Sequence, residues 1–147
     1  MLPTKHMPQS QRKRIRLVPS VYTKQGQYFS VTLGTHKRIP YFADREIASQ
    51  TFTLLLDGDL RRSAELATAC LMPDHLHMLI APTAESLVTV IQYWKSYTTF
   101  VARQKFGIVK LWQRSFYDHA LRTEENVHAV ARYILNNPVR AGLATDW

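Results

Sequence analysis

The chain has 147 residues, which allows one compact domain with a modest core and is too short for two. Its 19 Lys and Arg residues outnumber 11 Asp and Glu, and the net charge of +8 favours polyanions, nucleic acid first, as partners. No stretch approaches the roughly 18 apolar residues of a membrane span, and the single cysteine, Cys70, excludes an intrachain disulfide, so we expect a protein of the reducing cytosol with no membrane partner.

Basic residues and prolines dominate the N-terminal segment, residues 1–22, which shows neither helical nor strand periodicity. We expect a basic arm there and a single folded domain over residues 23–147. Such an arm is either an ordinary solvated tail or a contact for phosphate backbones. The cations available for those contacts include Arg12, Arg14 and Arg16.

The folded domain begins with a predicted strand and helix. Aromatic and β-branched residues over 28–35 predict the strand. Asp44 is a typical N-cap for the helix that follows, and Gly58 is the expected end of that helix. The residues predicted to face the core are Ile47, Ala48, Phe52, Leu55 and Leu56.

A hairpin and a long helix follow. Two apolar segments, 65–71 and 75–81, flank a Pro73-Asp74 turn signal and predict antiparallel strands. Helical periodicity then runs over residues 85–105 and ends at Gly107. Its predicted buried side carries Leu87, Ile91, Trp94, Thr98 and Val101.

The last predicted elements are a strand over residues 111–122 and a helix. Thr123 is expected to cap this helix and Pro138 to end it, because the residue before a proline avoids helical angles. The predicted buried stripe is Val127, Val130, Ala131, Ile134 and Leu135. The order strand, helix, strand, strand, helix, strand, helix indicates an α+β fold, an antiparallel sheet packed with helices.

His75 and His77 stand two apart on a predicted strand, so both imidazoles point to the same face of the sheet. Two converging imidazoles can bind a divalent ion, which would polarise a phosphate beside it. The alternative is that the pair simply lies on a polar face. The ligand types do not select between zinc, another transition metal and magnesium.

Tyr133 and Asn137 stand four apart on the last predicted helix and should share one face. A tyrosine hydroxyl can attack phosphorus when a metal activates the phosphate, and Asn137 offers an oxygen that would complete a His, His, Asn metal site. The alternative for Tyr133 is a tyrosine at the core edge whose hydroxyl reaches solvent.

Three motifs occur in order, within a match that extends over about residues 28–143, nearly the whole chain. They are Met72-Pro73-Asp74-His75-Leu76-His77, then Trp112-Gln113-Arg114-Ser115-Phe116-Tyr117-Asp118-His119, then Arg132-Tyr133-Ile134 to Asn137-Pro138 with Ala141-Gly142-Leu143. In this combination the chain resembles the REP-associated tyrosine transposases, domesticated relatives of the insertion-sequence transposases with a His-hydrophobic-His motif.

The resemblance implies a ferredoxin-like antiparallel sheet with the tyrosine on the C-terminal helix. It implies a transposase domain over residues 23–147 that cleaves and rejoins single-stranded DNA beside small palindromic hairpins. The tyrosine of this family forms a 5′-phosphotyrosine and releases a 3′-hydroxyl. Tyr133 matches the nucleophile, and His75, His77 and Asn137 match the positions that hold Mg²⁺ or Mn²⁺.

The DNA-contacting residues predicted here combine the basic arm with cations of the folded domain. The domain residues are Lys95, Arg103, Arg114 and Arg122. A protein of this family is expected at the bacterial nucleoid. Insertion-sequence relatives are dimers that exchange the tyrosine helix, whereas the domesticated branch resembles monomers, so the chain is expected to be a monomer or a homodimer.

Two other functions remain open from the sequence. The first is a regulator that binds hairpin DNA without cutting it. The second is a zinc hydrolase built on the histidine pair, which needs a general base beside the metal-bound water, and Asp74 and Asp118 are the acidic residues in motif context. Asp118 and His119 also match a recurring pair of the family, for which a supporting role is expected.

Overall fold

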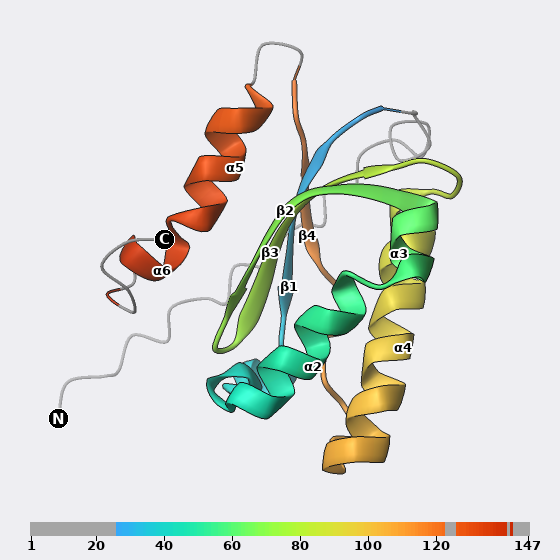
Figure 1. The fold of residues 1–147 in the computed structure, drawn as a ribbon, viewed down its shortest axis with the longest axis vertical. Coiled ribbons are helices and arrows are strands. Elements are labelled where there is room, and N and C mark those ends of the chain that lie inside the picture. The colour runs from blue at the N-terminus through green and yellow to red at the C-terminus, as the bar shows by residue number, and fades with distance from the viewer. Residues whose placement is uncertain (1–25, 123–125, 141, 143–147) are drawn as a thin grey trace, which may run out of the picture.

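The computed structural model describes residues 26–122, 126–140 and 142, and the strands of this part form one antiparallel sheet in the order β2-β3-β1-β4 (Figure 1). The strands are β1 Phe29–Gly34, β2 Ala64–Met72, β3 His75–Pro82 and β4 Tyr117–Ala120. With helices after β1 and β3, this is the ferredoxin-like arrangement. The predicted α+β fold is confirmed. The basic arm, with Arg12, Arg14 and Arg16, lies outside the described residues.

Helices cover both faces of the sheet (Figure 1). One side carries α2 Arg45–Leu55, α3 Gly58–Ser63 and α4 Leu87–Phe106, and the other carries α5 Val127–Leu135 and the short α6 Asn137–Arg140. Within the described part of the chain, no helix combines the length and apolar character needed to cross a bilayer.

The alternation of β3 assigns its side chains to two packed layers. Leu76, Met78 and Ile80 are fully buried in the larger core, which includes residues of α2 and α4. Leu79 points to the opposite face and is buried against Ile134 of α5, in a smaller cluster with Cys70 and Met72 of β2. His75 and His77 have the same parity as Leu79, so they lie on the face that α5 covers.

The hairpin of β2 and β3 forms as the sequence predicts. Met72 pairs with His75, which leaves Pro73 and Asp74 as a two-residue turn. Both turn carbonyls accept hydrogen bonds from the segment after β1, Pro73 O from Phe42 N at 3.0 Å and Asp74 O from Thr35 N at 2.9 Å. The turn is therefore attached to the domain at its tip.

Helix α2 begins at the predicted cap but ends earlier than predicted. The Asp44 carboxylate accepts from Glu46 N at 2.9 Å and Ile47 N at 3.2 Å, satisfying two amides of the first turn. The helix ends at Leu55, and Gly58 starts α3 instead of closing α2. Leu56 is 44% exposed rather than buried, because it caps the helix while Leu55 and Thr51 face the core.

Helix α4 has the predicted extent within two residues. Ser86 caps it by accepting from Thr89 N, and Gly107 ends it at a φ of 68°, a left-handed conformation that glycine adopts without a Cβ penalty. Leu87, Ile91, Trp94 and Thr98 are buried as predicted. Further buried positions are Val90 and Ala102, whereas Val101 is only partly buried.

The predicted strand over residues 111–122 is mostly wrong, since only Tyr117–Ala120 is a strand. Leu111 and Trp112 are both buried, which breaks the alternation of a half-buried strand. The carbonyl of Gln113 accepts from the Lys95 ammonium at 2.5 Å rather than from a neighbouring strand. Residues 109–114 therefore run between α4 and the end of β1, where Trp112 forms an isolated bridge with Thr35.

The last helix begins at Val127 and is capped by Asn126, whose side chain accepts from His128 N at 2.8 Å. Thr123, the predicted cap, lies outside the described residues. Ile134 is buried, and Val127, Val130 and Ala131 pack around it as predicted. Helix α5 ends at Leu135, before Pro138. Pro138 itself lies in the first turn of α6, where proline is tolerated because its missing N–H would have no partner within the helix.

Trp112 joins the segment 109–114 to α4. Its ring packs between Phe42 and Trp94, with centroid distances of 5.4 and 5.3 Å. Its Nε1 donates to the buried Thr98 hydroxyl at 2.8 Å, and that hydroxyl donates to Trp94 O at 2.9 Å. The indole N–H is thus satisfied inside the core by one threonine.

We predict that Thr98→Val lowers the free energy of unfolding by about 1–3 kcal/mol, because valine keeps the shape and leaves the indole N–H buried without an acceptor. Chemical denaturation measures the change. The matched control is Thr53→Val on α2, since the exposed Thr53 hydroxyl makes only a bond to Ser49 O within its helix. Equal stability of the two variants would contradict this role of Thr98.

Candidate functional site on the histidine face of the sheet

The two histidines converge on one point of the sheet. His75 Nε2 lies 3.1 Å from His77 Nε2, and the two rings meet edge to face with centroids 4.7 Å apart. Both residues are partly buried, and the His75 side chain is 18% exposed. The structure therefore confirms the predicted shared face and adds that the outer ring nitrogens point toward each other.

Each inner ring nitrogen has an oxygen partner. His75 Nδ1 lies 2.7 Å from Asp74 Oδ1, and His77 Nδ1 lies 2.9 Å from Thr32 Oγ1. Asp74 in turn forms an ion pair with Arg38 at 3.2 Å. The oxygen partners hold both rings in the orientation that directs the Nε2 atoms into the site.

Asp74 is an anion in this arrangement. Partial burial pushes its pKa upward, but the hydrogen bond to His75 and the Arg38 guanidinium outweigh burial and lower the pKa below its ordinary value. An ionised carboxylate only accepts hydrogen bonds, so His75 Nδ1 carries the proton that it shares with Asp74. In the neutral form of His75, this leaves Nε2 with a lone pair directed toward His77.

The tautomer of His77 follows from the same chain of bonds. For neutral imidazoles, His77 Nε2–H donates a hydrogen bond to His75 Nε2, and His77 Nδ1 accepts one from the Thr32 hydroxyl. A cation held by both Nε2 atoms needs the opposite tautomer of His77, with its proton on Nδ1. The Thr32 hydroxyl suits both cases because it can donate or accept.

The two Nε2 atoms are suitable ligands for a divalent cation. Two imidazole nitrogens face one point, and each is oriented from behind by an oxygen, an arrangement that metal-binding histidines commonly show. In the described part of the chain, no three His, Cys, Asp or Glu side chains gather as a metal cluster. Within this part of the chain, a further ligand would come from another kind of donor, such as an amide oxygen.

Cys70 lies beside His77 in the register of β2 and β3 but is not a suitable ligand. Its side chain is buried against Ile134 of α5 and its neighbours. This burial raises the pKa of the thiol, which keeps it in the neutral form that metals bind poorly.

Tyr133 and Asn137 lie in the helices that cover the histidine face. Tyr133 precedes the buried Ile134 on α5 and is 59% exposed, which places it outside the core. Asn137 is partly buried at the start of α6, and α6 contacts β2. The predicted single helical face for the two residues is wrong as stated, since α5 ends at Leu135.

The register places a second tyrosine in the same row of the sheet. Thr32 of β1 pairs with His77 on one side and with Tyr117 of β4 on the other, so Tyr117 projects from the histidine face and is 50% exposed. His119 shares this face. Asp118 points to the opposite face, so the predicted support of the site by an Asp118-His119 pair does not hold for both residues.

Gln113 is the site residue that the sequence analysis missed. A Cβ at Gly34, which pairs with His75, would lie 2.8 Å from Cδ and Oε1 of Gln113. The Gln113 amide therefore occupies the space beside His75 that the glycine leaves open. The signal was Gly34 itself, because a glycine inside a strand marks a close approach of another group.

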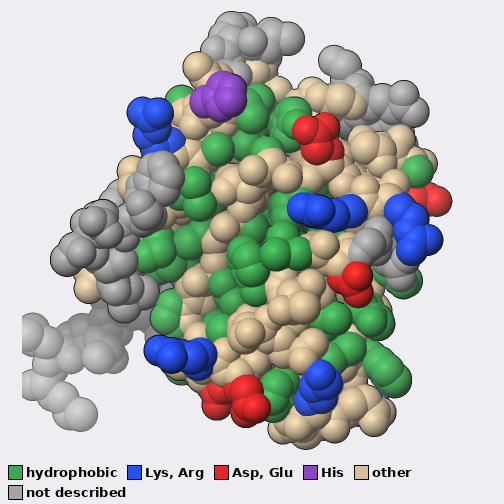
Figure 2. Space-filling view, in the orientation of Figure 1, with side chains coloured by type: hydrophobic (Ala, Val, Ile, Leu, Met, Phe, Trp, Pro, Cys, Tyr) green, Lys and Arg blue, Asp and Glu red, His purple; other side chains and the backbone are tan. Residues whose placement is uncertain are grey.

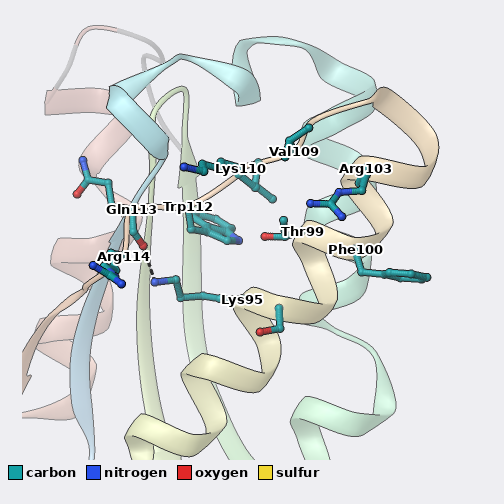
Figure 3. A pocket seen from close by; sticks show the side chains of 11 residues that line it. Lys95, Thr99, Phe100, Arg103, Val109, Lys110, Trp112, Gln113 and Arg114 are labelled. Atoms are coloured by element: carbon teal, nitrogen blue, oxygen red, sulfur yellow. Dashed lines mark hydrogen bonds between the residues drawn. The ribbon is translucent and has the colours of Figure 1, made fainter.

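The predicted DNA contacts separate into two groups. Lys95, Arg103 and Arg114 line one groove between α4 and residues 109–114, together with Lys110 (Figure 3). Arg122 follows β4, is exposed, and does not line this groove. Arg103 lies 8 positions after Lys95 in the sequence and Arg114 lies 19 positions after it, a spacing that gives no hint of a common groove.

Comparisons with known proteins point to one family. The family model for IS200-like transposases matches residues 23–137. A Haemophilus influenzae protein named provisionally as a REP-associated tyrosine transposase is 29% identical over 146 residues, covering 86% of this chain and 79% of that protein. An uncharacterized protein of the same organism is 28% identical over 87 residues, and this match covers 57% of the chain and about half, 48%, of that protein's length.

Two solved structures share the fold. A REP-associated tyrosine transposase bound to a REP hairpin has a TM-score of 0.63 at 19% identity, over 83% of this chain and 72% of that one. A provisionally named transposase from Deinococcus radiodurans has a TM-score of 0.56 at 20% identity, over 74% of this chain and 88% of that one.

We predict that Asp74→Asn weakens Mn²⁺ binding about 10- to 100-fold, because the carboxylate that orients His75 and raises its basicity is lost. Titration calorimetry on the purified proteins measures the affinity. Asp44→Asn is the matched control, since asparagine is also a good N-cap for α2. Unchanged Mn²⁺ affinity in Asp74→Asn would show that the histidine pair is not the binding site.

Proposed function

The chain belongs to the family of IS200-like transposases, and from this premise we propose that it cleaves and rejoins single-stranded DNA beside hairpins through a 5′-phosphotyrosine intermediate. The observation that supports the proposal best is the convergence of His75 and His77 Nε2 at 3.1 Å, with both Nδ1 atoms engaged. The helix that covers this face carries an exposed tyrosine, Tyr133.

The histidine pair is proposed to hold Mg²⁺ or Mn²⁺, with the Asn137 side-chain oxygen as a third ligand. Asp74 and Thr32 keep the two imidazoles directed at the ion. The ion, when bound, would polarise the scissile phosphate and stabilise negative charge that develops on its oxygens. The zinc hydrolase alternative lacks support, because Asp74 is engaged with His75 and Arg38 and Asp118 faces away.

Tyr133 is proposed as the nucleophile. Its hydroxyl oxygen loses a proton to solvent and bonds to phosphorus, while the bond from phosphorus to the 3′ oxygen breaks and that oxygen takes up a proton. The 5′ phosphate stays on the tyrosine. Attack by another 3′-hydroxyl reverses these steps and reforms a phosphodiester, so no external energy source is needed.

The DNA is proposed to be held through its phosphates by the basic residues of the chain. The proposed contacts in the described part are Lys95, Arg103, Arg114 and Arg122, and the arm would add Arg12, Arg14 and Arg16. A hairpin substrate is supported by the structural neighbour that was solved with a REP hairpin bound. The net charge of +8 agrees with a polyanionic substrate.

We predict that Tyr133→Phe abolishes a covalent protein–DNA adduct and leaves hairpin binding within about twofold, because only the nucleophilic oxygen is removed. The assay incubates the protein with labelled hairpin DNA and Mn²⁺ and separates the products on a denaturing protein gel. The matched control is Tyr117→Phe, which removes the other exposed tyrosine hydroxyl of the histidine face.

Each outcome of this experiment selects one assignment. An adduct that persists in Tyr117→Phe and is lost in Tyr133→Phe supports the proposal. Loss in Tyr117→Phe alone would assign the nucleophile to β4. Hairpin retention without any adduct in the native protein, over several hairpins and metals, would indicate a regulator that binds DNA without cutting it.

A further inference from the structure

A groove of about 430 Å³ lies between α4 and residues 109–114, apart from the histidine pair. Figure 3 shows the long side chains that line it, with Arg103 and Thr99 reaching from α4 toward Lys110 and Trp112. Its cations are Lys95, Arg103, Lys110 and Arg114. The proposed function uses three of these as separate phosphate contacts, whereas the structure brings all four to one groove.

The charge of this groove has one sign. None of its lining residues is acidic, whereas acidic and basic side chains are interspersed on the face shown in Figure 2. Lys95 is half-buried, and desolvation lowers its pKa, because the charged form loses contact with water. The Lys95 ammonium donates to the carbonyl of Gln113 at 2.5 Å, which carries no charge. An anion in the groove would neutralise the charge of Lys95.

The groove has a rigid floor. Trp112 is 7% exposed and is held by the Thr98 hydroxyl at 2.8 Å, with its ring against Trp94 of α4. The hydroxyls of Ser96 and Thr99 also line the groove and can donate to phosphate oxygens. The floor of the groove is therefore formed before any ligand binds, which reduces the entropy cost of binding.

Gln113 connects the groove to the histidine face. Its carbonyl accepts from the groove residue Lys95, and its N–H donates to Gly34 O at 2.8 Å. Its side-chain amide lies where a Cβ of Gly34 would be, next to the strand position of His75. Gln113 therefore lines the groove and also lies next to the strand position of His75.

The outer rim of the groove is apolar. Phe100 is 59% exposed and its ring projects from α4 away from the cations (Figure 3). Tyr97 and Tyr93 continue this exposed row along the helix, and their rings are parallel within 7°. Proteins that bind single strands combine a basic groove for the phosphates with exposed aromatic rings on which bases stack, and Phe100 at the edge of this groove can supply such a ring.

We propose that this groove binds the single-stranded DNA that flanks the hairpin, with its phosphates between Lys95, Arg103, Lys110 and Arg114 and a base stacked on Phe100, and that it directs this strand past Gln113 to the histidine pair. The inference rests on the proposed function and deepens it by assigning a path to the unpaired strand. A base-paired duplex has no free base face for Phe100, and a second copy of a chain with a charge of +8 would bring like charge to the groove.

The test compares two labelled DNA probes by fluorescence anisotropy: a blunt hairpin, and the same hairpin with an oligothymidine extension. The double variant Arg103→Gln/Lys110→Gln is expected to lose affinity for the extended probe and to bind the blunt probe as the native protein does. For the extended probe, the slope of log affinity against log salt should fall by about 0.7 per cation removed. Arg45→Gln/Arg61→Gln is the matched control, because both residues are exposed on α2 and α3 outside the groove.

A second pair of variants tests the stacking. Phe100→Leu keeps an apolar side chain without a ring and should weaken binding of the extended probe about five- to 150-fold, whereas Phe100→Trp should retain it. Equal losses with both probes would show that the groove contacts the duplex, and no loss with either would show that it is not a DNA site. A change in oligomeric state by light scattering, with DNA binding intact, would assign the rim to contacts between copies.

These readouts are independent of cleavage. Failure of the proposed function appears as the absence of a Tyr133 adduct in the native protein, which the anisotropy assay does not use. Failure of the groove assignment appears when the variants lose no affinity for the extended probe, or lose equal affinity for both probes, while the adduct still forms.

Discussion

The pairing of β3 with β1 is the constraint on which the rest of the site depends. Leu76, Met78 and Ile80 are fully buried on one face of the sheet. A shift of the β3 register by one residue would turn them to the opposite face and would turn the two histidines away from the face that α5 covers. The same register sets His77 opposite Thr32 and His75 opposite Gly34. The core thereby decides both the hydrogen-bond partner of one histidine and the free space beside the other.

Asp74 connects the fold to the chemistry of the site. Its backbone carbonyl accepts from both the N–H and the hydroxyl of Thr35, which attaches the hairpin turn to the end of β1. Its carboxylate bonds His75 and pairs with Arg38, which has a φ of 57° in the segment after β1. Residues far apart in the sequence thus orient one imidazole, and the turn that shapes the hairpin also determines the tautomer of its first histidine.

Residues 109–114 contribute side chains to both faces of the sheet. Trp112 is buried with the α4 side, while Gln113 reaches the histidine side over Gly34. Because this segment leaves the sheet to contact α4, its cations and those of α4 face one groove. A regular strand over residues 111–122 would have placed alternate side chains on the two faces and left no such groove.

Local patterns in the sequence were sufficient for the α+β order of elements, the Pro73-Asp74 turn, the caps at Asp44 and Gly107 and the shared face of His75 and His77. Each of these depends on neighbours within a few positions, where periodicity, turn chemistry and capping act. The loss of strand before Tyr117 and the row that joins His77, Thr32 and Tyr117 depend instead on contacts between distant segments. Gln113 beside His75 and the four-cation groove likewise exist only because the tertiary fold brings α4, β1 and residues 109–114 together, and no spacing along the chain records that contact.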